Sequence, residues 1–158
     1  SHGPWYYQQI DLGFNYRMTD MQAILGASQM KRIDDFVKRR NVLAKRYSDL
    51  LKDLPVTLPW QHPDSYSAYH LFVIRLRLNE MEKSHRQVFE ELRDAGVGIN
   101  LHYIPVHTQP YYKQFGFKQG DFPEAEKYYH EAISLPMYYG LTEENQDRVT
   151  EVLRNTMK

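Results

Sequence analysis

Apolar residues between positions 33 and 54 recur at steps of three and four, the pattern of an amphipathic helix. The apolar positions are Ile33, Phe36, Val37, Leu43, Ala44, Tyr47, Leu50, Leu51 and Leu54. Pro55 ends the predicted helix, because proline can neither donate the next hydrogen bond nor fit the preceding turn. The basic residues Lys38, Arg39, Arg40, Lys45 and Arg46 lie mostly off the apolar stripe, so we expect a solvated face.

The strongest strand pattern covers residues 69–78, which are continuously apolar in the middle and alternate at the end. This pattern is typical of a strand that is buried centrally and half exposed later. Residues 97–103 predict a second strand, residues 133–135 a brief third strand, and residues 56–58 a short extended piece.

Helix starts are marked by local capping signals. Thr19 with Gln22, and Ser84 with Gln87, each form the pattern of a capping box. The first box opens a helix over residues 20–30 that is rich in small residues, so we expect one of its faces to be buried. The second box opens a helix that Gly96 is well placed to end.

Three further helical pieces follow in the second half of the chain. Pro123 opens a helix to about residue 132, Thr142 caps a final helix that reaches Arg154, and residues 111–115 predict a short helical piece. The order of helices and strands predicts an α+β fold with a small sheet that helices cover on one face.

Composition narrows the classes of function. The 158 residues suit one domain with a real core, and 20 basic and 20 acidic residues cancel, which disfavours a nucleic-acid or acidic-lipid surface. Cysteine is absent, so disulfides and thiolate metal sites are excluded, and a reducing, cytoplasmic location is expected. No apolar run approaches the roughly 20 residues of a bilayer span, so we expect no membrane partner.

The segment 11–20 combines anion-binding donors with the start of a helix. Asn15 offers an amide and Arg17 a guanidinium fork, and both lie just before the predicted cap at Thr19. Donors close to a helix N-terminus suit a phosphate or carboxylate. The alternative is that Asn15 is a turn residue and Arg17 a solvated charge, and spacing alone does not decide between these hypotheses.

The segment 102–112 gathers two imidazoles and three phenols where a predicted strand ends. His102 and His107 are five residues apart across a proline with no third ligand indicated, so we predict no metal site. The chain also lacks a Gly-x-Ser-x-Gly elbow and a Gly-rich phosphate loop. No complete catalytic constellation is therefore predicted in this chain.

Several motifs together resemble the C-terminal part of the DegT/DnrJ/EryC1/StrS sugar aminotransferases. They are Gly13-Phe14-Asn15-Tyr16-Arg17-Met18-Thr19-Asp20-Met21-Gln22-Ala23, Arg39-Arg40, Tyr69-His70-Leu71-Phe72-Val73-Ile74, Gly98-Ile99-Asn100-Leu101-His102-Tyr103, His107-Thr108-Gln109 with Tyr111-Tyr112, and Ile133-Ser134-Leu135-Pro136. The resemblance spans nearly all of the chain. Pro4-Trp5-Tyr6-Tyr7 and the His-Thr-Gln-x-Tyr-Tyr pattern look most like the branch that aminates C4 of UDP-linked 4-keto-6-deoxy sugars, including the pseudaminic acid type.

The resemblance implies a fold-type-I aminotransferase that uses pyridoxal 5'-phosphate (PLP), normally as a homodimer. It implies a small, mostly antiparallel sheet, with residues 1–158 as one C-terminal small domain and residues 1–18 as an arm leading in from a PLP-binding domain. Glutamate would donate the amino group to the nucleotide-sugar substrate for surface polysaccharide synthesis. The family's Schiff-base lysine lies upstream, and no lysine here matches its motif. We therefore expect no catalytic residue in this chain, which would be inert by itself.

The resemblance also implies roles for individual residues. Asn15 would reach the cofactor phosphate of the partner subunit, with Arg17 nearby. His102, His107, Tyr111 and Tyr112 would border the nucleotide-sugar pocket, which Tyr6 would help to close. The alternative is a module that binds sugars or partners without catalysis, an interpretation that the 13 tyrosines favour.

Overall fold

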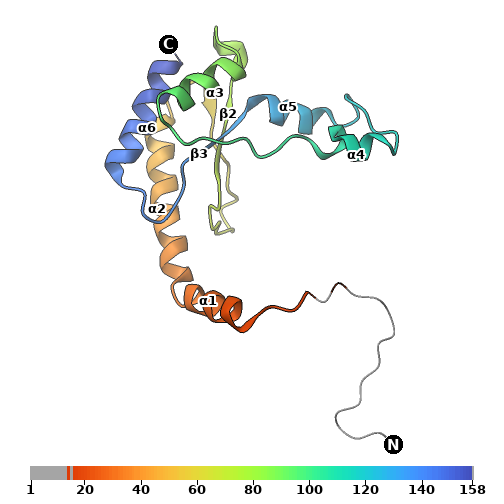
Figure 1. Cartoon of the computed structure of the whole chain (residues 1–158). Helices are drawn as coiled ribbons and strands as arrows, with labels where there is room; N and C mark the ends of the chain where they lie inside the picture. The colour runs from red at the N-terminus through yellow and green to blue at the C-terminus, as the bar shows by residue number, and fades with distance from the viewer. Residues whose placement is uncertain (1–13, 15, 158) are drawn as a thin grey trace, which may run out of the picture. The chain divides into compact units, whose positions relative to one another are not determined.

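The computed structural model describes residues 14 and 16–157 (Figure 1). The chain divides into two units, residues 1–34 and 35–158. In the part of the chain that the structure describes, no helix is both long and apolar enough to cross a membrane.

The first unit contains helix α1 (Asp20–Met30), which begins at the predicted capping box. The Gln22 amide donates to Thr19 Oγ1 at 3.3 Å, and the Thr19 amide donates to Gln22 Oε1 at 3.0 Å. No residue of α1 is buried, and Met21 and Ile24 are 81% and 70% exposed. The prediction of a buried face is therefore wrong for this chain, because the described residues place nothing over the apolar sides of α1.

The second unit contains a three-stranded antiparallel sheet in the order β1-β2-β3. Its strands are β1 (Val56–Thr57), β2 (Phe72–Leu76) and β3 (Ala132–Leu135). The register pairs Val56 with Leu76 and Phe72 with Leu135. Along β2, alternate residues are buried and half-buried, so one face of the sheet points into the core. The predicted α+β class with a small antiparallel sheet is confirmed.

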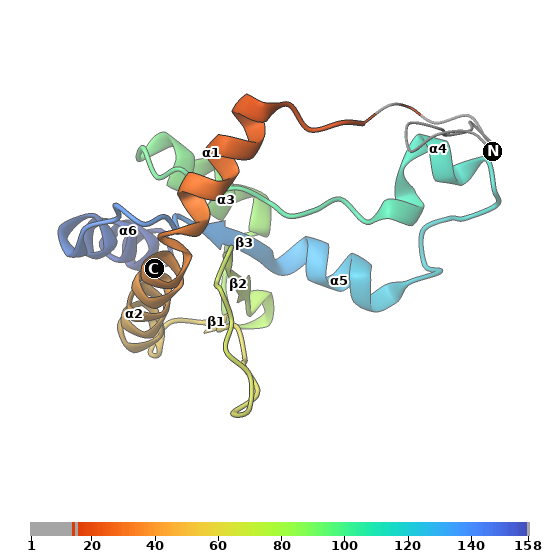
Figure 2. The ribbon, with the colours of Figure 1, turned by 90° about the horizontal axis from the view of Figure 1, so that it is seen from below.

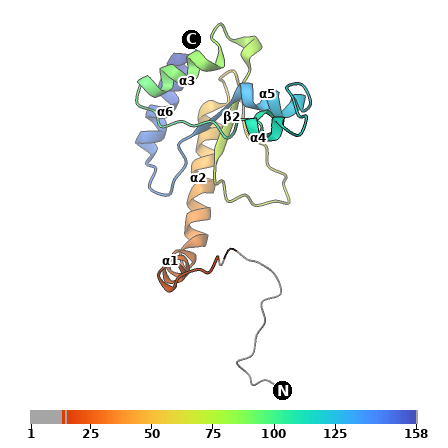
Figure 3. The ribbon, with the colours of Figure 1, turned by 45° about the vertical axis from the view of Figure 1, so that its right-hand side comes forward.

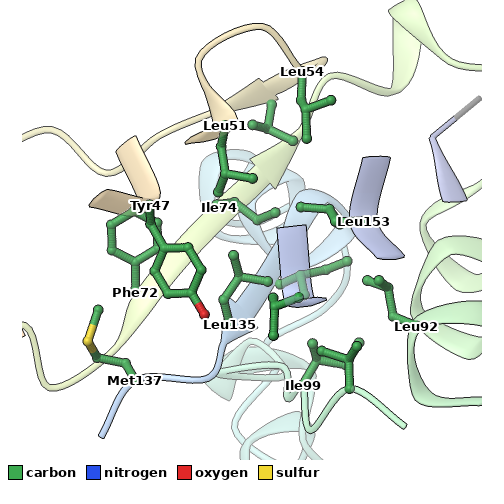
Figure 4. Close-up of a cluster of buried hydrophobic side chains, with 14 of the residues drawn as sticks. Tyr47, Leu51, Leu54, Phe72, Ile74, Leu92, Ile99, Leu135, Met137 and Leu153 are labelled. Atoms are coloured by element: carbon green, nitrogen blue, oxygen red, sulfur yellow. The ribbon is translucent and has the colours of Figure 1, made fainter. Parts of the chain in front are cut away.

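Three helices surround the core: α2 (Ile33–Leu51), α3 (His85–Asp94) and α6 (Glu143–Thr156). Helices α3 and α6 lie side by side, as Figures 1 and 3 both show. The core side chains come from the sheet, from these helices and from the loops beside them, which contribute Leu54, Ile99 and Met137 among others (Figure 4). Among them the rings of Tyr47 and Phe72 lie 5.2 Å apart between centroids. This burial is what holds the short strands together, since so small a sheet is marginal without a packed face.

The predicted strands are longer than the observed ones. The strand expected over 69–78 is confined to β2, and the strand expected over 97–103 is reduced to one bridge between Asn100 and Ser134. In that bridge the Ser134 amide donates to the Asn100 carbonyl at 2.8 Å, and the Asn100 amide donates back at 3.2 Å. The difference arises because strand pairing extends only as far as a partner does, and β3 has four residues.

Residues 101–131 form what we call the aromatic lobe. An extended segment with a 3₁₀ turn, η2 (Val106–Thr108), leads to α4 (Pro110–Lys113), and α5 (Pro123–Glu131) returns directly into β3. Figures 1 and 2 show the segment before α4 running beside α5. A second 3₁₀ turn, η1 (Leu78–Glu80), lies outside the lobe and follows β2.

Three arginines of α2, Arg39, Arg40 and Arg46, differ from the predicted solvated face. Arg39 donates to the Leu141 carbonyl at 2.7 Å. Arg40 Nη1 donates to three carbonyl oxygens, those of Tyr69 at 2.9 Å, His70 at 3.0 Å and Met137 at 3.2 Å. Arg39 and Arg40 are half-buried, so the prediction is wrong for them because the loops beside the sheet offer carbonyl groups that need donors. Arg46 is also half-buried, because it donates to Asp147 Oδ1 of α6 at 2.8 Å.

Candidate functional site

His102 is held by a hydroxyl of the sheet. Its Nδ1 lies 2.7 Å from Ser134 Oγ, and Ser134 is only 4% exposed on β3. Ser134 pairs with Val73 across the sheet, so both side chains lie on the face opposite to Phe72 and Ile74. The hydroxyl therefore fixes the imidazole at the edge of the sheet, next to the bridge at Asn100.

A cavity of about 480 Å³ opens beside this pair. Most of its lining is apolar, and its polar side chains come from the sheet edge and from α6: Asn100, His102, Ser134, Asn145 and Arg148. Amide, imidazole, hydroxyl and guanidinium groups are the donors and acceptors that sugars and phosphates require. We call it the polar cavity after these five side chains, and it suits a ligand with both polar and apolar surface.

His107 lies in the aromatic lobe and is 7% exposed. Its Nε2 lies 2.8 Å from Glu126 Oε1, and the Gly120 amide donates to the same oxygen at 2.6 Å. The hydrogen bond from His107 is the main reason that the pKa of the Glu126 carboxyl lies below its ordinary value, and the one from the Gly120 amide adds to it. Glu126 therefore stays ionised at neutral pH and acts as an acceptor.

Aromatic side chains gather around α4 on the surface of the lobe. Tyr111 packs edge-on against Tyr112 and Phe115, with centroids 5.3 and 5.4 Å apart. Tyr111 is 65% exposed. A second cavity of about 420 Å³ is lined by Val106, His107, Tyr112, Phe117, Phe122 and Ala125, and its wall is mainly apolar. Such exposed aromatic surface is typical of binding sites.

The predicted substrate-binding residues are brought together only in part. His107 and Tyr112 share the apolar cavity, with Tyr111 packed against Tyr112, whereas His102 lines the polar cavity. Of the predicted cofactor-binding residues, Arg17 is exposed and forms no ion pair with the described residues. Asn15 and Tyr6 lie outside the described residues.

Sequence reasoning missed Ser134 and Glu126. A hydroxyl in an apolar strand signals a buried group that needs a partner, so Ser134 could have been singled out. Glu126 carries no such signal, because a carboxylate in the first turn of a helix is ordinary. Among the described residues, no cluster of three His, Asp or Glu side chains could hold a metal ion.

The sequence profile of the DegT/DnrJ/EryC1/StrS aminotransferase family matches residues 2–154. The chain belongs to this family. One relative is the spore coat polysaccharide biosynthesis protein SpsC of Bacillus subtilis, which is 38% identical over 161 residues. The alignment covers all of this chain and 41% of SpsC.

Solved structures agree with the family assignment. Helicobacter pylori PseC, an aminotransferase of pseudaminic acid biosynthesis, matches with a TM-score of 0.86 and 26% identity over 99% of this chain and 42% of PseC. The PLP-form of a Streptococcus pneumoniae protein matches with a TM-score of 0.87 and 26% identity over 99% of this chain and 40% of that one. The chain thus spans about two fifths of the length of these relatives.

Of the two predicted cofactor-binding residues, the structure describes Arg17. The Streptococcus pneumoniae neighbour was solved in its PLP-form. In this chain the exposed guanidinium of Arg17 lies two residues before the N-cap of α1, a position that favours an anion. A guanidinium can grip a phosphate through two parallel hydrogen bonds. Arg17 therefore has the charge and the position that suit a phosphate group such as that of PLP.

Proposed function

We propose that this chain is the C-terminal small domain of a PLP-dependent nucleotide-sugar aminotransferase. The enzyme transfers the amino group of glutamate to C4 of a UDP-linked 4-keto-6-deoxy sugar for surface polysaccharide synthesis. It works as a homodimer, and residues 1–18 lead in from the cofactor-binding domain. The observation that carries the proposal is the family match over residues 2–154. The likeness to PseC and SpsC supports a sugar as the amino acceptor.

In this proposal the chain supplies binding groups. Asn15 and Arg17 hold the cofactor phosphate of the partner subunit. His102, oriented by Ser134, donates to or accepts from the nucleotide-sugar in the polar cavity. Tyr111 and Tyr112 offer flat apolar faces with hydroxyl groups, which suit a base or a sugar ring, and Tyr6 helps to close the pocket.

The chemistry that PLP supplies when bound is withdrawal of electrons from the substrate carbon. The proton-shuttling lysine lies in the preceding domain, so this chain shapes and orients the pocket. Positioning of this kind contributes to catalysis by holding the keto carbon where the amino group is delivered.

The test is a coupled assay on the full-length protein that contains this chain. The purified protein is loaded with PLP and mixed with glutamate and a UDP-4-keto-6-deoxy sugar, and the products are identified by mass spectrometry. We expect a UDP-4-amino sugar and 2-oxoglutarate in equal amounts. A protein that takes up no PLP, or that binds the nucleotide-sugar without forming an amino sugar, would overturn the proposal; the second result would favour a sugar-binding module.

A further inference from the structure

One oxygen of Glu126 connects both ends of the segment that carries the exposed tyrosines. Glu126 Oε1 accepts from His107 Nε2, just before α4, and from the Gly120 amide, well after it. Residues 108–119 lie between these two contacts and include Tyr111 and Tyr112. The carboxylate therefore closes residues 108–119 into a loop.

The other contacts of this loop are local: the Lys118 amide donates to Asp121 Oδ2 at 2.9 Å, and the rings of Phe117 and Phe122 lie 6.1 Å apart between centroids. Helix α4 spans only Pro110–Lys113, far shorter than a helix that is stable by itself. All of residues 110–120 are exposed. The position of α4 depends in part on its two flanks, and Glu126 connects both of them.

Glu126 also determines which nitrogen of His107 carries a proton. An ionised carboxylate has no hydrogen to donate, so Nε2 must be the donor and Nδ1 is left as an acceptor in the neutral ring. Among the described residues, His107 has no other hydrogen-bond partner for its side chain. The ring of Phe122 packs on it at 4.9 Å between centroids, which holds the ring but does not select a tautomer.

We propose that Glu126 is a positioning residue for nucleotide-sugar binding, which orients His107 and closes the loop 108–119 so that Tyr111 and Tyr112 face the substrate together. This inference rests on the proposed function. Glu126 itself is engaged by His107 and Gly120, so it acts on the substrate through them.

The experiment compares Glu126→Ala and Glu126→Gln in the full-length protein. Glu124→Ala is the matched control, because Glu124 is the other acid in the first turn of α5 and is exposed. We expect Glu126→Ala to raise the KM for the nucleotide-sugar by about tenfold, the lower end of the loss seen when the partner that orients a metal-binding histidine is removed. The rate at which glutamate reduces the absorbance of bound cofactor should stay unchanged. Because Glu126→Gln keeps an oxygen in place, its KM for the nucleotide-sugar should lie between those of wild type and Glu126→Ala.

Hydrogen exchange measured by mass spectrometry gives a readout that needs no activity. In Glu126→Ala the amides of residues 108–120 should exchange faster, and in Glu124→Ala they should not. Unchanged exchange in Glu126→Ala, or faster exchange with an unchanged KM, would overturn the inference. If the wild-type protein forms no amino sugar, the proposed function fails, and exchange with and without bound UDP-sugar still decides whether Glu126 orders this loop for a nucleotide-sugar. Should the alanine variant not fold, the glutamine variant decides by the same two measurements.

Discussion

His102 Nδ1 lies 2.7 Å from Ser134 Oγ, a contact between a half-buried imidazole and a buried strand residue 32 positions away. The pair links the edge of the sheet to the polar cavity. Among the described residues, the hydroxyl is the side-chain hydrogen-bond partner of His102, and it orients the imidazole together with the edge-on ring of Tyr103 at 4.6 Å between centroids.

Ser134→Ala should therefore loosen His102 without disrupting the sheet. Loss of one hydrogen bond is expected to lower the free energy of unfolding by about 1 kcal/mol. The KM for the nucleotide-sugar should rise several-fold while the reaction with glutamate is unaffected, which steady-state kinetics on the full-length enzyme would measure. Ser134→Thr keeps a hydroxyl and serves as the control; equal defects in both variants would contradict the orienting role.

Arg40→Ala should be strongly destabilising. Arg40 donates to three backbone carbonyls from two loops, and its removal leaves these acceptors without their cationic donor. We expect a loss of about 3 kcal/mol in the free energy of unfolding, measured by urea denaturation. Lys38→Ala is the control, because Lys38 lies on the same helix and is exposed. A loss no larger than that of the control would show that solvent replaces these contacts.

The stabilising effect of Glu126 should depend on pH. The pKa of Glu126 is lower in the folded state than in the unfolded state. Its contribution to the free energy of unfolding is therefore complete above the unfolded-state pKa of about 4.3, and it is lost as the pH falls through the lower folded-state pKa. Glu126→Gln should accordingly melt at a lower temperature than wild type at pH 7, and the difference should shrink as the pH falls below about 4. Thermal melts across this range measure it, and a difference that is constant with pH would argue against an ionised Glu126.

Arg17→Ala should weaken retention of the cofactor in the full-length protein. Removing a guanidinium from a phosphate site costs a charge-assisted contact, so we expect the dissociation constant of PLP to rise by about tenfold. Absorbance of bound cofactor after dialysis is the measurement, with Asn15→Ala as a second variant and Lys31→Ala as the control. Unaltered PLP retention in both Arg17→Ala and Asn15→Ala would show that these residues do not bind the cofactor phosphate.

Ile24→Glu should separate folding of this chain from assembly of the enzyme. Ile24 is 70% exposed, so the change should alter the free energy of unfolding of the 158-residue chain by less than about 0.5 kcal/mol. In the full-length protein we expect the partner subunit to cover the exposed apolar residues of α1. The new charge should therefore reduce dimer formation. Light scattering with size-exclusion chromatography distinguishes the two states. A dimer as stable as wild type would place α1 away from the interface.

The candidate site was only partly predictable. His102, His107, Tyr111 and Tyr112 stand out because they cluster within eleven residues at the end of a predicted strand. Their separation into a polar and an apolar cavity does not follow from spacing. The roles of Ser134 and Glu126 depend on partners 32 and 19 residues away, and no local pattern encodes such contacts.

The sequence by itself determined the features that depend on a few adjacent residues. The capping boxes at Thr19 and Ser84 are present as predicted, because a side chain three residues from its partner needs only a helical turn to reach it. Only the tertiary structure decided where strands end, which arginines donate hydrogen bonds to loop carbonyls, and which carboxylate accepts the hydrogen bond of His107. These outcomes depend on which distant groups packing of the core brings within hydrogen-bond range.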